Sequence, residues 1–129
     1  MAHIMVVDDE RDVVTLIKFL LEKDGHKVTE AYHGEEALEK LGLEPKRAGV
    51  ELPDLIIVDV MMPVMDGYTT ATRLRENPLT RPIPLVILTA KGQMRELFEM
   101  APNVAAYIEK PFDPKALRDL VAGMLSTNK

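Results

Sequence analysis

Several short apolar runs in this sequence end in polar side chains that can bind a cation or a phosphoryl group. These side chains are Asp8 and Asp9 after residues 4–7, Asp59 after 55–58, Thr89 after 83–88 and Lys110 after 104–108. Asp59 is the most informative of them, because the next polar residue along the chain is Asp66. Burying a carboxylate is costly unless it is paired, hydrogen-bonded or bound to a metal. A fold that buries Asp59 must therefore compensate its charge.

The elements that position these residues follow from the hydrophobic pattern. The runs just described, together with residues 27–32, have the length and composition of strands. Helical spacing predicts helices from a cap at Asp9 or Glu10 to Gly25, over 34–41, from a cap at Asp66 to about 76, over 94–101, and from a cap at Asp113 to 124. Strands and helices therefore alternate along the whole chain.

This alternation predicts an α/β doubly wound fold, in which right-handed crossovers build a parallel sheet with helices on both faces. The runs at 4–7, 55–58 and 83–88 are apolar without alternation, as strands covered on both faces usually are. Ligands of such sheets bind beyond the carboxyl ends of the strands. We therefore expect the three acids, Thr89 and Lys110 to gather at one edge of a single domain spanning residues 1–129.

Composition argues against several classes of function. The chain has 129 residues, the length of one domain, and its net charge of -5 argues against a general nucleic-acid surface. It contains no cysteine, which excludes disulfides and thiolate metal sites and is compatible with a reducing cytoplasm. No apolar stretch is long enough to span a membrane, and the first residues lack the pattern of a secretion signal. We expect a cytoplasmic protein that binds neither nucleic acid nor a membrane.

The three acids favour a magnesium site. Carboxylates held close together repel one another, and a hard divalent cation relieves this repulsion. Asp8, Asp9 and Asp59 together carry about three negative charges, which Mg²⁺ and Lys110 would balance. An acyl phosphate on Asp59 would add about one more negative charge. Thr89 and Lys110 are the residues expected to sense that extra charge.

The motifs, taken in order, resemble those of response-regulator receiver domains, the phosphoacceptor modules of two-component signalling. The matching segments are VVDDE at 6–10, DVMMPVMDG at 59–67, LTA at 88–90 and YIEKPF at 107–112. The resemblance extends over essentially the whole chain. It implies a flavodoxin-like, doubly wound sheet of five parallel strands in the order 2-1-3-4-5, with five helices.

The resemblance also implies a role for each site residue. Asp59 would accept a phosphoryl group from a sensor histidine kinase or a phosphotransfer protein, in a magnesium-dependent reaction. The other implied roles are Asp8, Asp9, Asp59 and the Met61 backbone carbonyl as metal ligands, Thr89 and Lys110 as contacts of the phosphoryl oxygens, Thr89 and Tyr107 as the switch, and Lys110–Pro111 as a cis peptide.

The resemblance further implies how the signal leaves the domain. A receiver domain with no attached effector would signal by contact with a downstream protein. The fourth helix, the fifth strand and the last helix would form the face that this protein binds. Such a domain is a phosphoacceptor rather than an enzyme.

Other interpretations of the same residues remain open. Taken alone, Asp9 is explained as a helix cap, Asp59 as a buried acid held by backbone amides, and Lys110 as a solvated lysine. A phosphatase of the haloacid-dehalogenase type would need a second acid two positions after the nucleophile, where this chain has Met61. The main alternative is a pseudo-receiver, an interaction module that has the fold and signals without phosphate.

Further expectations concern packing and the residue after the acid pair. We expect Tyr68, Ala71 and Leu74 to face the core, and the three histidines to be surface residues because they lack ligand spacing. We also expect Glu10→Ala to change magnesium binding and phosphorylation little, in contrast to Asp9→Ala.

Overall fold

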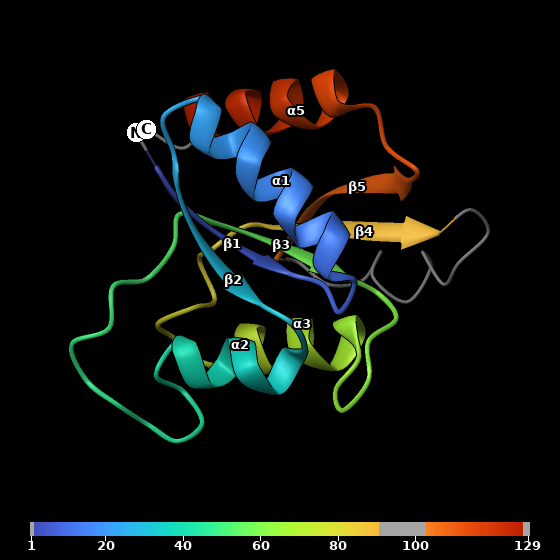
Figure 1. Ribbon diagram of the computed structural model, residues 1–129. Coiled ribbons are helices and arrows are strands. Elements are labelled where there is room, and N and C mark those ends of the chain that lie inside the picture. The colour runs from blue at the N-terminus through green and yellow to red at the C-terminus, as the bar shows by residue number, and fades with distance from the viewer. Residues whose placement is uncertain (1, 91–102, 128–129) are drawn as a thin grey trace.

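A sheet of five parallel strands forms the centre of the molecule (Figure 1). The computed structural model describes residues 2–90 and 103–127. The strands are β1 (His3–Val7), β2 (Lys27–Ala31), β3 (Leu55–Asp59), β4 (Leu85–Ala90) and β5 (Val104–Lys110). They lie in the order β2-β1-β3-β4-β5, and every neighbouring pair is parallel. The expected doubly wound sheet and its strand order are confirmed.

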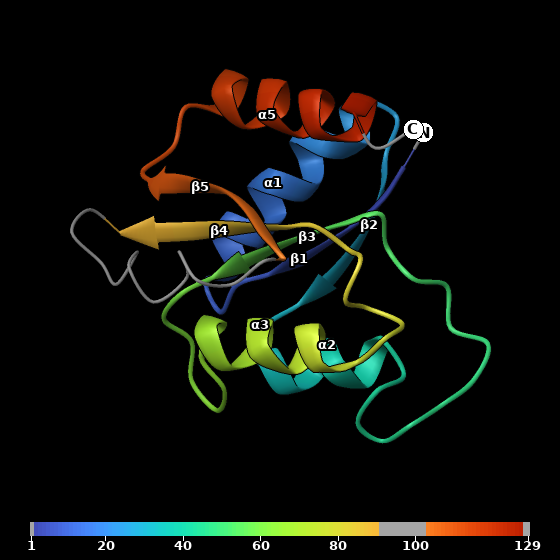
Figure 2. The ribbon, with the colours of Figure 1, turned by 180° about the vertical axis from the view of Figure 1, so that it is seen from behind.

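Helices cover both faces of this sheet. They are α1 (Arg11–Lys23), α2 (Gly34–Lys40), α3 (Gly67–Glu76) and α5 (Pro114–Thr127). The helices α1 and α5 lie on one face and α2 and α3 on the other, as Figures 1 and 2 show from opposite sides. The described residues contain these four helices, and the fifth expected helix, 94–101, lies outside them. None of the helices described is long and apolar enough to cross a membrane.

The sheet divides the hydrophobic core into two clusters. Successive strand residues point to opposite faces, so each strand contributes to both clusters. In β1, Ile4 and Val6 pack in the cluster under α1 and α5, which we call the α1/α5 cluster. Met5 and Val7 pack in the cluster on the other side, the α2/α3 cluster. Because both faces are covered, the strands need apolar residues at consecutive positions, which explains their unbroken apolar runs.

The helix α3 begins where the sequence predicts. Asp66 is its N-cap residue, and the side chain accepts a hydrogen bond of 2.7 Å from the backbone N–H of Thr69. Ala71 and Leu74 are buried, as expected. Tyr68 was expected in the core, but 39% of it is exposed, so this expectation was wrong. The buried residues of α3 are Gly67, Thr70, Ala71 and Leu74, so position 68 lies beside the buried stripe rather than within it.

One histidine also departs from expectation. His3 is buried, because it lies on β1 between two other strands of the sheet. Its Nε2 is 2.7 Å from the hydroxyl of Thr29, and its Nδ1 is 3.3 Å from a carboxylate oxygen of Glu51. The contact with Thr29 satisfies one ring nitrogen, whereas Nδ1 has no hydrogen bond and lies only within ion-pair distance of Glu51.

Candidate functional site

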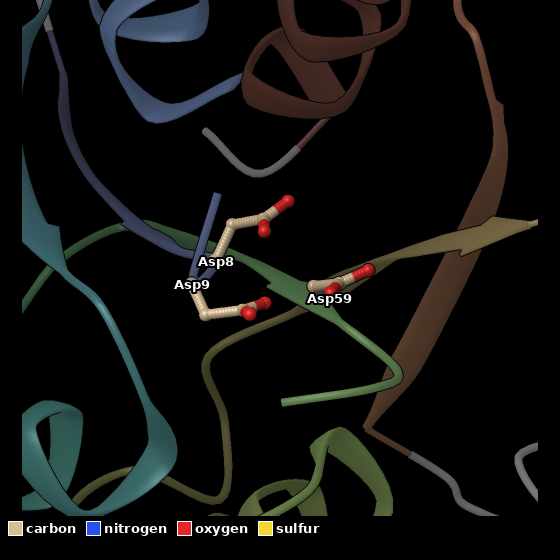
Figure 3. Close-up of side chains that lie close together, drawn as sticks. All are labelled: Asp8, Asp9 and Asp59. Carbon is tan, nitrogen blue, oxygen red and sulfur yellow. The ribbon is translucent and has the colours of Figure 1, made fainter. Parts of the chain in front are cut away.

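The three aspartates predicted to cluster do come together at the carboxyl ends of β1 and β3. Asp8 lies two residues after Val6, whose side chain belongs to the α1/α5 cluster. Asp59 lies two residues after Ile57 of the same cluster. Both carboxylates therefore emerge on one face of the sheet, and Figure 3 shows them projecting beside that of Asp9. A carboxylate oxygen from each of the three lies within 4.8 Å of the others.

Lys110 supplies the compensating charge that Asp59 requires. It lies at the end of β5, and its Nζ is 2.8 Å from Asp8 Oδ2 and 3.2 Å from Asp59 Oδ1. Its side chain is only 17% exposed. Burial lowers the pKa of Lys110, but the adjacent carboxylates of Asp8 and Glu10 outweigh this effect and raise the pKa overall. The ammonium is therefore charged at neutral pH.

One lysine does not neutralise the whole cluster. Asp59 is 5% exposed, and burial together with the negative charge of Asp8 raises its pKa to about 6, against the lowering effect of Lys110. Burial also raises the pKa of Asp8, and Lys110 opposes that shift. The site thus carries an excess of negative charge, which a cation would relieve.

The donor set fits a hard divalent cation. Asp8 is fully buried, and its Oδ2 has no hydrogen-bond partner, since the nearby Lys110 Nζ lies at ion-pair distance without hydrogen-bond geometry. The ion pair with Lys110 offsets part of the cost of burying this oxygen, and a metal ion would satisfy it further. Oxygen ligands from three carboxylates are typical of magnesium sites rather than zinc sites.

An open depression gives access to the acids from solvent. Its volume is about 210 Å³, and it is lined by Asp9, Glu10, Asp59, Met61, Ala90 and Lys110. Met61 is 57% exposed and forms part of the wall. The β3–α3 loop returns to Asp59 at Gly67, whose N–H donates to the carbonyl of Val60 over 2.8 Å. The role of the Met61 carbonyl as a metal ligand stays a prediction.

Thr89 and Tyr107 lie near this site but on the other face of the sheet. Thr89 is buried at the end of β4, two residues after Ile87 of the α2/α3 cluster. Tyr107 on β5 is half-buried against the same cluster and pairs with Ile87. The structure therefore gathers Asp8, Asp9, Asp59 and Lys110 into one charged group and leaves Thr89 and Tyr107 beside it. The peptide bond Lys110–Pro111 is cis, as the family resemblance implied.

Glu10 is a site residue that the sequence analysis did not recognise. It occupies the N-cap position of α1 without a capping hydrogen bond from its side chain. Its Oε1 instead accepts a hydrogen bond of 2.8 Å from Lys110 Nζ. The acidic run at 8–10 was the available signal, but Glu10 was considered only as one of two possible helix caps, the other being Asp9.

Comparison with known proteins identifies a family for this arrangement. The family model for the response regulator receiver domain matches residues 4–122. This span contains all of the sheet except His3, the first residue of β1, and each residue of the charged group.

Individual relatives agree with the family model. The chain is 38% identical over 123 residues to the alkaline phosphatase synthesis transcriptional regulatory protein PhoP of Bacillus subtilis, covering 95% of this chain and 48% of that protein. It is 33% identical to the response regulator SaeR of Staphylococcus epidermidis, covering 99% of this chain and 54% of that protein. The chain thus spans about half the length of these curated relatives.

A solved structure aligns with this chain over the whole length of the chain. It is the signal receiver domain of a signal transduction histidine kinase from Syntrophus aciditrophicus, with a TM-score of 0.85 and 32% identity. The match covers 100% of this chain and 93% of that one.

Proposed function

This chain belongs to the family of response regulator receiver domains, and we propose that its Asp59 accepts a phosphoryl group from a phosphohistidine. The observation that carries the proposal is the joint placement of Asp8, Asp9, Asp59 and Lys110. Three carboxylates and one ammonium converge at the mouth of an open depression, at the carboxyl edge of a doubly wound sheet.

The proposed reaction is a phosphoryl transfer to a carboxylate. An ionised oxygen of Asp59 attacks the phosphorus atom, the new O–P bond forms as the N–P bond of the donor breaks, and the imidazole leaves with a proton from solvent. The pKa of about 6 leaves Asp59 mostly ionised at neutral pH. Lys110, already beside Asp59, is placed to contact a phosphoryl oxygen.

Asp8, Asp9 and Asp59 would hold a magnesium ion, with the carbonyl of Met61 as a further ligand. When bound, the ion would neutralise negative charge on the phosphoryl oxygens. The unsatisfied Oδ2 of buried Asp8 and the raised pKa of Asp59 support this assignment.

The signal would leave the site through Thr89 and Tyr107. In this proposal Thr89 moves toward the phosphoryl group and Tyr107 fills the space that it vacates, so two packed arrangements exchange. Their common face and neighbouring strands support this coupling. The output face would include β5 and α5, while the helix expected at 94–101 lies outside the described residues.

The partners follow from the family. A histidine kinase or a phosphotransfer protein would be the donor, and the receiver would signal by contact with a downstream protein. The alternative is a pseudo-receiver that signals without phosphate. The complete charged group favours phosphorylation. A module that signals without phosphate does not require a buried Asp59 paired with Lys110.

Intact-mass spectrometry after incubation with acetyl phosphate and magnesium tests the proposal. We expect the wild-type protein to gain one phosphoryl mass, and Asp59→Asn or chelation of magnesium to abolish the gain. Asp66→Asn is the matched control, because it changes an exposed acid of the same loop to another good N-cap residue and should leave labelling intact.

Two results would contradict the proposal. Full labelling of Asp59→Asn would place the acceptor elsewhere, and absence of labelling in the wild-type protein would favour the pseudo-receiver. Backbone amide NMR tests the switch: chemical shifts that change on phosphorylation should include Thr89 and Tyr107, and changes confined to the neighbours of Asp59 would argue against transmission.

A further inference from the structure

The hydrogen bond of Lys110 goes to an exposed acid rather than to the acceptor. Three carboxylates surround the ammonium, namely Asp8 at 2.8 Å, Glu10 at 2.8 Å and Asp59 at 3.2 Å. Among the contacts described, the one to Glu10 has hydrogen-bond geometry. Three negative groups crowd one ammonium, so a phosphoryl oxygen gains a closer contact with Lys110 when one of these acids moves away.

Glu10 is the acid that can release Lys110 at least cost. Asp8 is fully buried, and its other oxygen, Oδ1, accepts a hydrogen bond of 2.9 Å from the backbone N–H of Glu10, so it cannot move without losing that bond. Asp59 carries the phosphoryl group itself. The side chain of Glu10 is 60% exposed, so its carboxylate regains water when it turns away from the site.

We propose that Glu10 is a positioning residue, which holds the Lys110 ammonium in the unphosphorylated protein and exchanges it for the phosphoryl group. The proposal rests on Asp59 being the phosphoacceptor. Glu10 then opposes phosphorylation in two ways, because it competes for Lys110 and adds a negative charge at the mouth of the depression, where an anionic donor must enter.

Two substitutions separate the contact from the charge. Glu10→Gln removes the charge and leaves only a weak acceptor for Lys110. Glu10→Asp keeps the charge, but the side chain is shorter by roughly 1.5 Å, which takes the carboxylate out of hydrogen-bond reach. Glu35→Gln is the control, because it removes the same charge from an exposed position on α2 that does not line the depression.

The experiment measures the rate of phosphorylation by acetyl phosphate, with magnesium saturating for each variant. We expect both Glu10 variants to react about three- to five-fold faster than the wild-type protein, the range set by one partly exposed ion pair. This replaces the expectation from the sequence that a change at Glu10 has little effect, because the contact with Lys110 could not be foreseen there. The Glu35→Gln rate should equal that of the wild-type protein. A wild-type rate for Glu10→Asp with a faster Glu10→Gln would mean that general electrostatics acts, which overturns the positioning role. Rates equal to or below the wild-type rate for both variants would overturn it as well.

A second measurement does not depend on phosphorylation. Urea unfolding of Glu10→Gln, Lys110→Met and the double variant gives the coupling between the two side chains, without magnesium or phosphodonor. We expect a non-zero coupling, and none between Glu35→Gln and Lys110→Met. Zero coupling at Glu10, with normal phosphorylation of the wild-type protein, would overturn this inference alone. Failure of the wild-type protein to be phosphorylated would instead overturn the proposed function and, with it, this role.

Discussion

At the scale of single residues, Asp59 is held in an environment that disfavours its charged form. Burial and the carboxylate of Asp8 raise its pKa to about 6, although Lys110 lies 3.2 Å away. The ionised carboxylate, which this environment destabilises, is also the nucleophile that the proposed reaction needs. The charge that makes Asp59 reactive therefore lowers the free energy of unfolding, and this loss of stability can be measured.

The stability of the protein should depend on pH through Asp59. Because the native pKa of about 6 exceeds the ordinary aspartate value of 3.8, the native state binds the proton more tightly, and stability falls as pH rises from about 4 to 6. Asp59→Asn does not titrate, so without metal it should match the wild-type protein near pH 4 and exceed it by about 2 kcal/mol above pH 7. Urea unfolding in EDTA across this range measures the difference.

Asp24 provides a comparison, because its pKa is shifted in the opposite direction to that of Asp59. Its pKa is lowered by the hydrogen bonds from Arg118, so its contribution to stability is present at neutral pH and is lost as pH falls. Asp24→Asn should therefore destabilise the protein at neutral pH. A difference between Asp59→Asn and the wild-type protein that stays constant from pH 4 to 7.5 would contradict the raised pKa of Asp59.

Another residue with a conformational cost lies in the loop after Asp59. Val64 has φ of 70°, a left-handed backbone conformation that a β-branched residue rarely adopts, and it is 72% exposed. Glycine removes that cost, which is about 1–2 kcal/mol. Its greater freedom in the unfolded chain destabilises the folded state by a smaller amount, about 0.5–1 kcal/mol. We expect Val64→Gly to raise the free energy of unfolding by about 0.5–1 kcal/mol in urea titrations.

Leu79→Gly tests whether this gain comes from the backbone. Leu79 is also exposed, at 60%, but does not have a positive φ, so the glycine should destabilise the protein there. If both glycine variants change stability in the same direction, the left-handed conformation of Val64 is not the cause.

At the scale of elements, a glycine contact fixes the start of α3 against the acceptor strand. A Cβ atom at Gly67 would overlap the carbonyl oxygen of Asp59 and lie 2.9 Å from the Cα of Val60. The absence of a side chain thus lets the first turn of α3 pack directly on the end of β3. The position of Asp59 depends on this contact, because the loop between β3 and α3 closes there.

Replacement of glycine by alanine should therefore have opposite effects on stability at Gly67 and at Gly123. Gly67→Ala should destabilise the protein by about 1–3 kcal/mol through overpacking and should slow phosphorylation, because it displaces Asp59. Gly123→Ala on α5 should stabilise the protein by about 0.5–1 kcal/mol, because a Cβ there meets no atom within 4 Å and glycine disfavours helix. Urea unfolding measures both, and an unchanged phosphorylation rate in Gly67→Ala would show that the contact does not position Asp59.

At the scale of the whole molecule, the sequence predicted the sheet because burial on both faces leaves a strong local signal. The unbroken apolar runs of β1, β3 and β4 and the polar residues that follow them could be read directly, and the strands then brought Asp8, Asp59 and Lys110 together. A residue whose partner is fixed only by tertiary contact left no such signal. Glu10 bonds to Lys110, 100 positions away, and its local position suggested a helix cap instead.

Orientation on a helix was predicted less well than position in the sheet. Tyr68 fits the apolar spacing of α3, but a residue of the first turn can match the periodic pattern and still face solvent. Similarly, no pattern in the loop indicated that Val64 would adopt a left-handed conformation, because β-branched residues seldom do. Both depend on how the loop docks onto the sheet, which is a property of the whole fold.

The edge strand β2 carries features that oppose association of two molecules through their sheets. An open sheet edge offers unpaired backbone groups that can recruit a strand from another chain and begin aggregation. On β2, the ammonium of Lys40 donates to the backbone carbonyl of Glu30, which occupies one of these groups. Lys27 and Glu30 add charges along the same strand, each paired with a neighbouring side chain. The β2 edge is thereby a poor template for the addition of a strand from another chain.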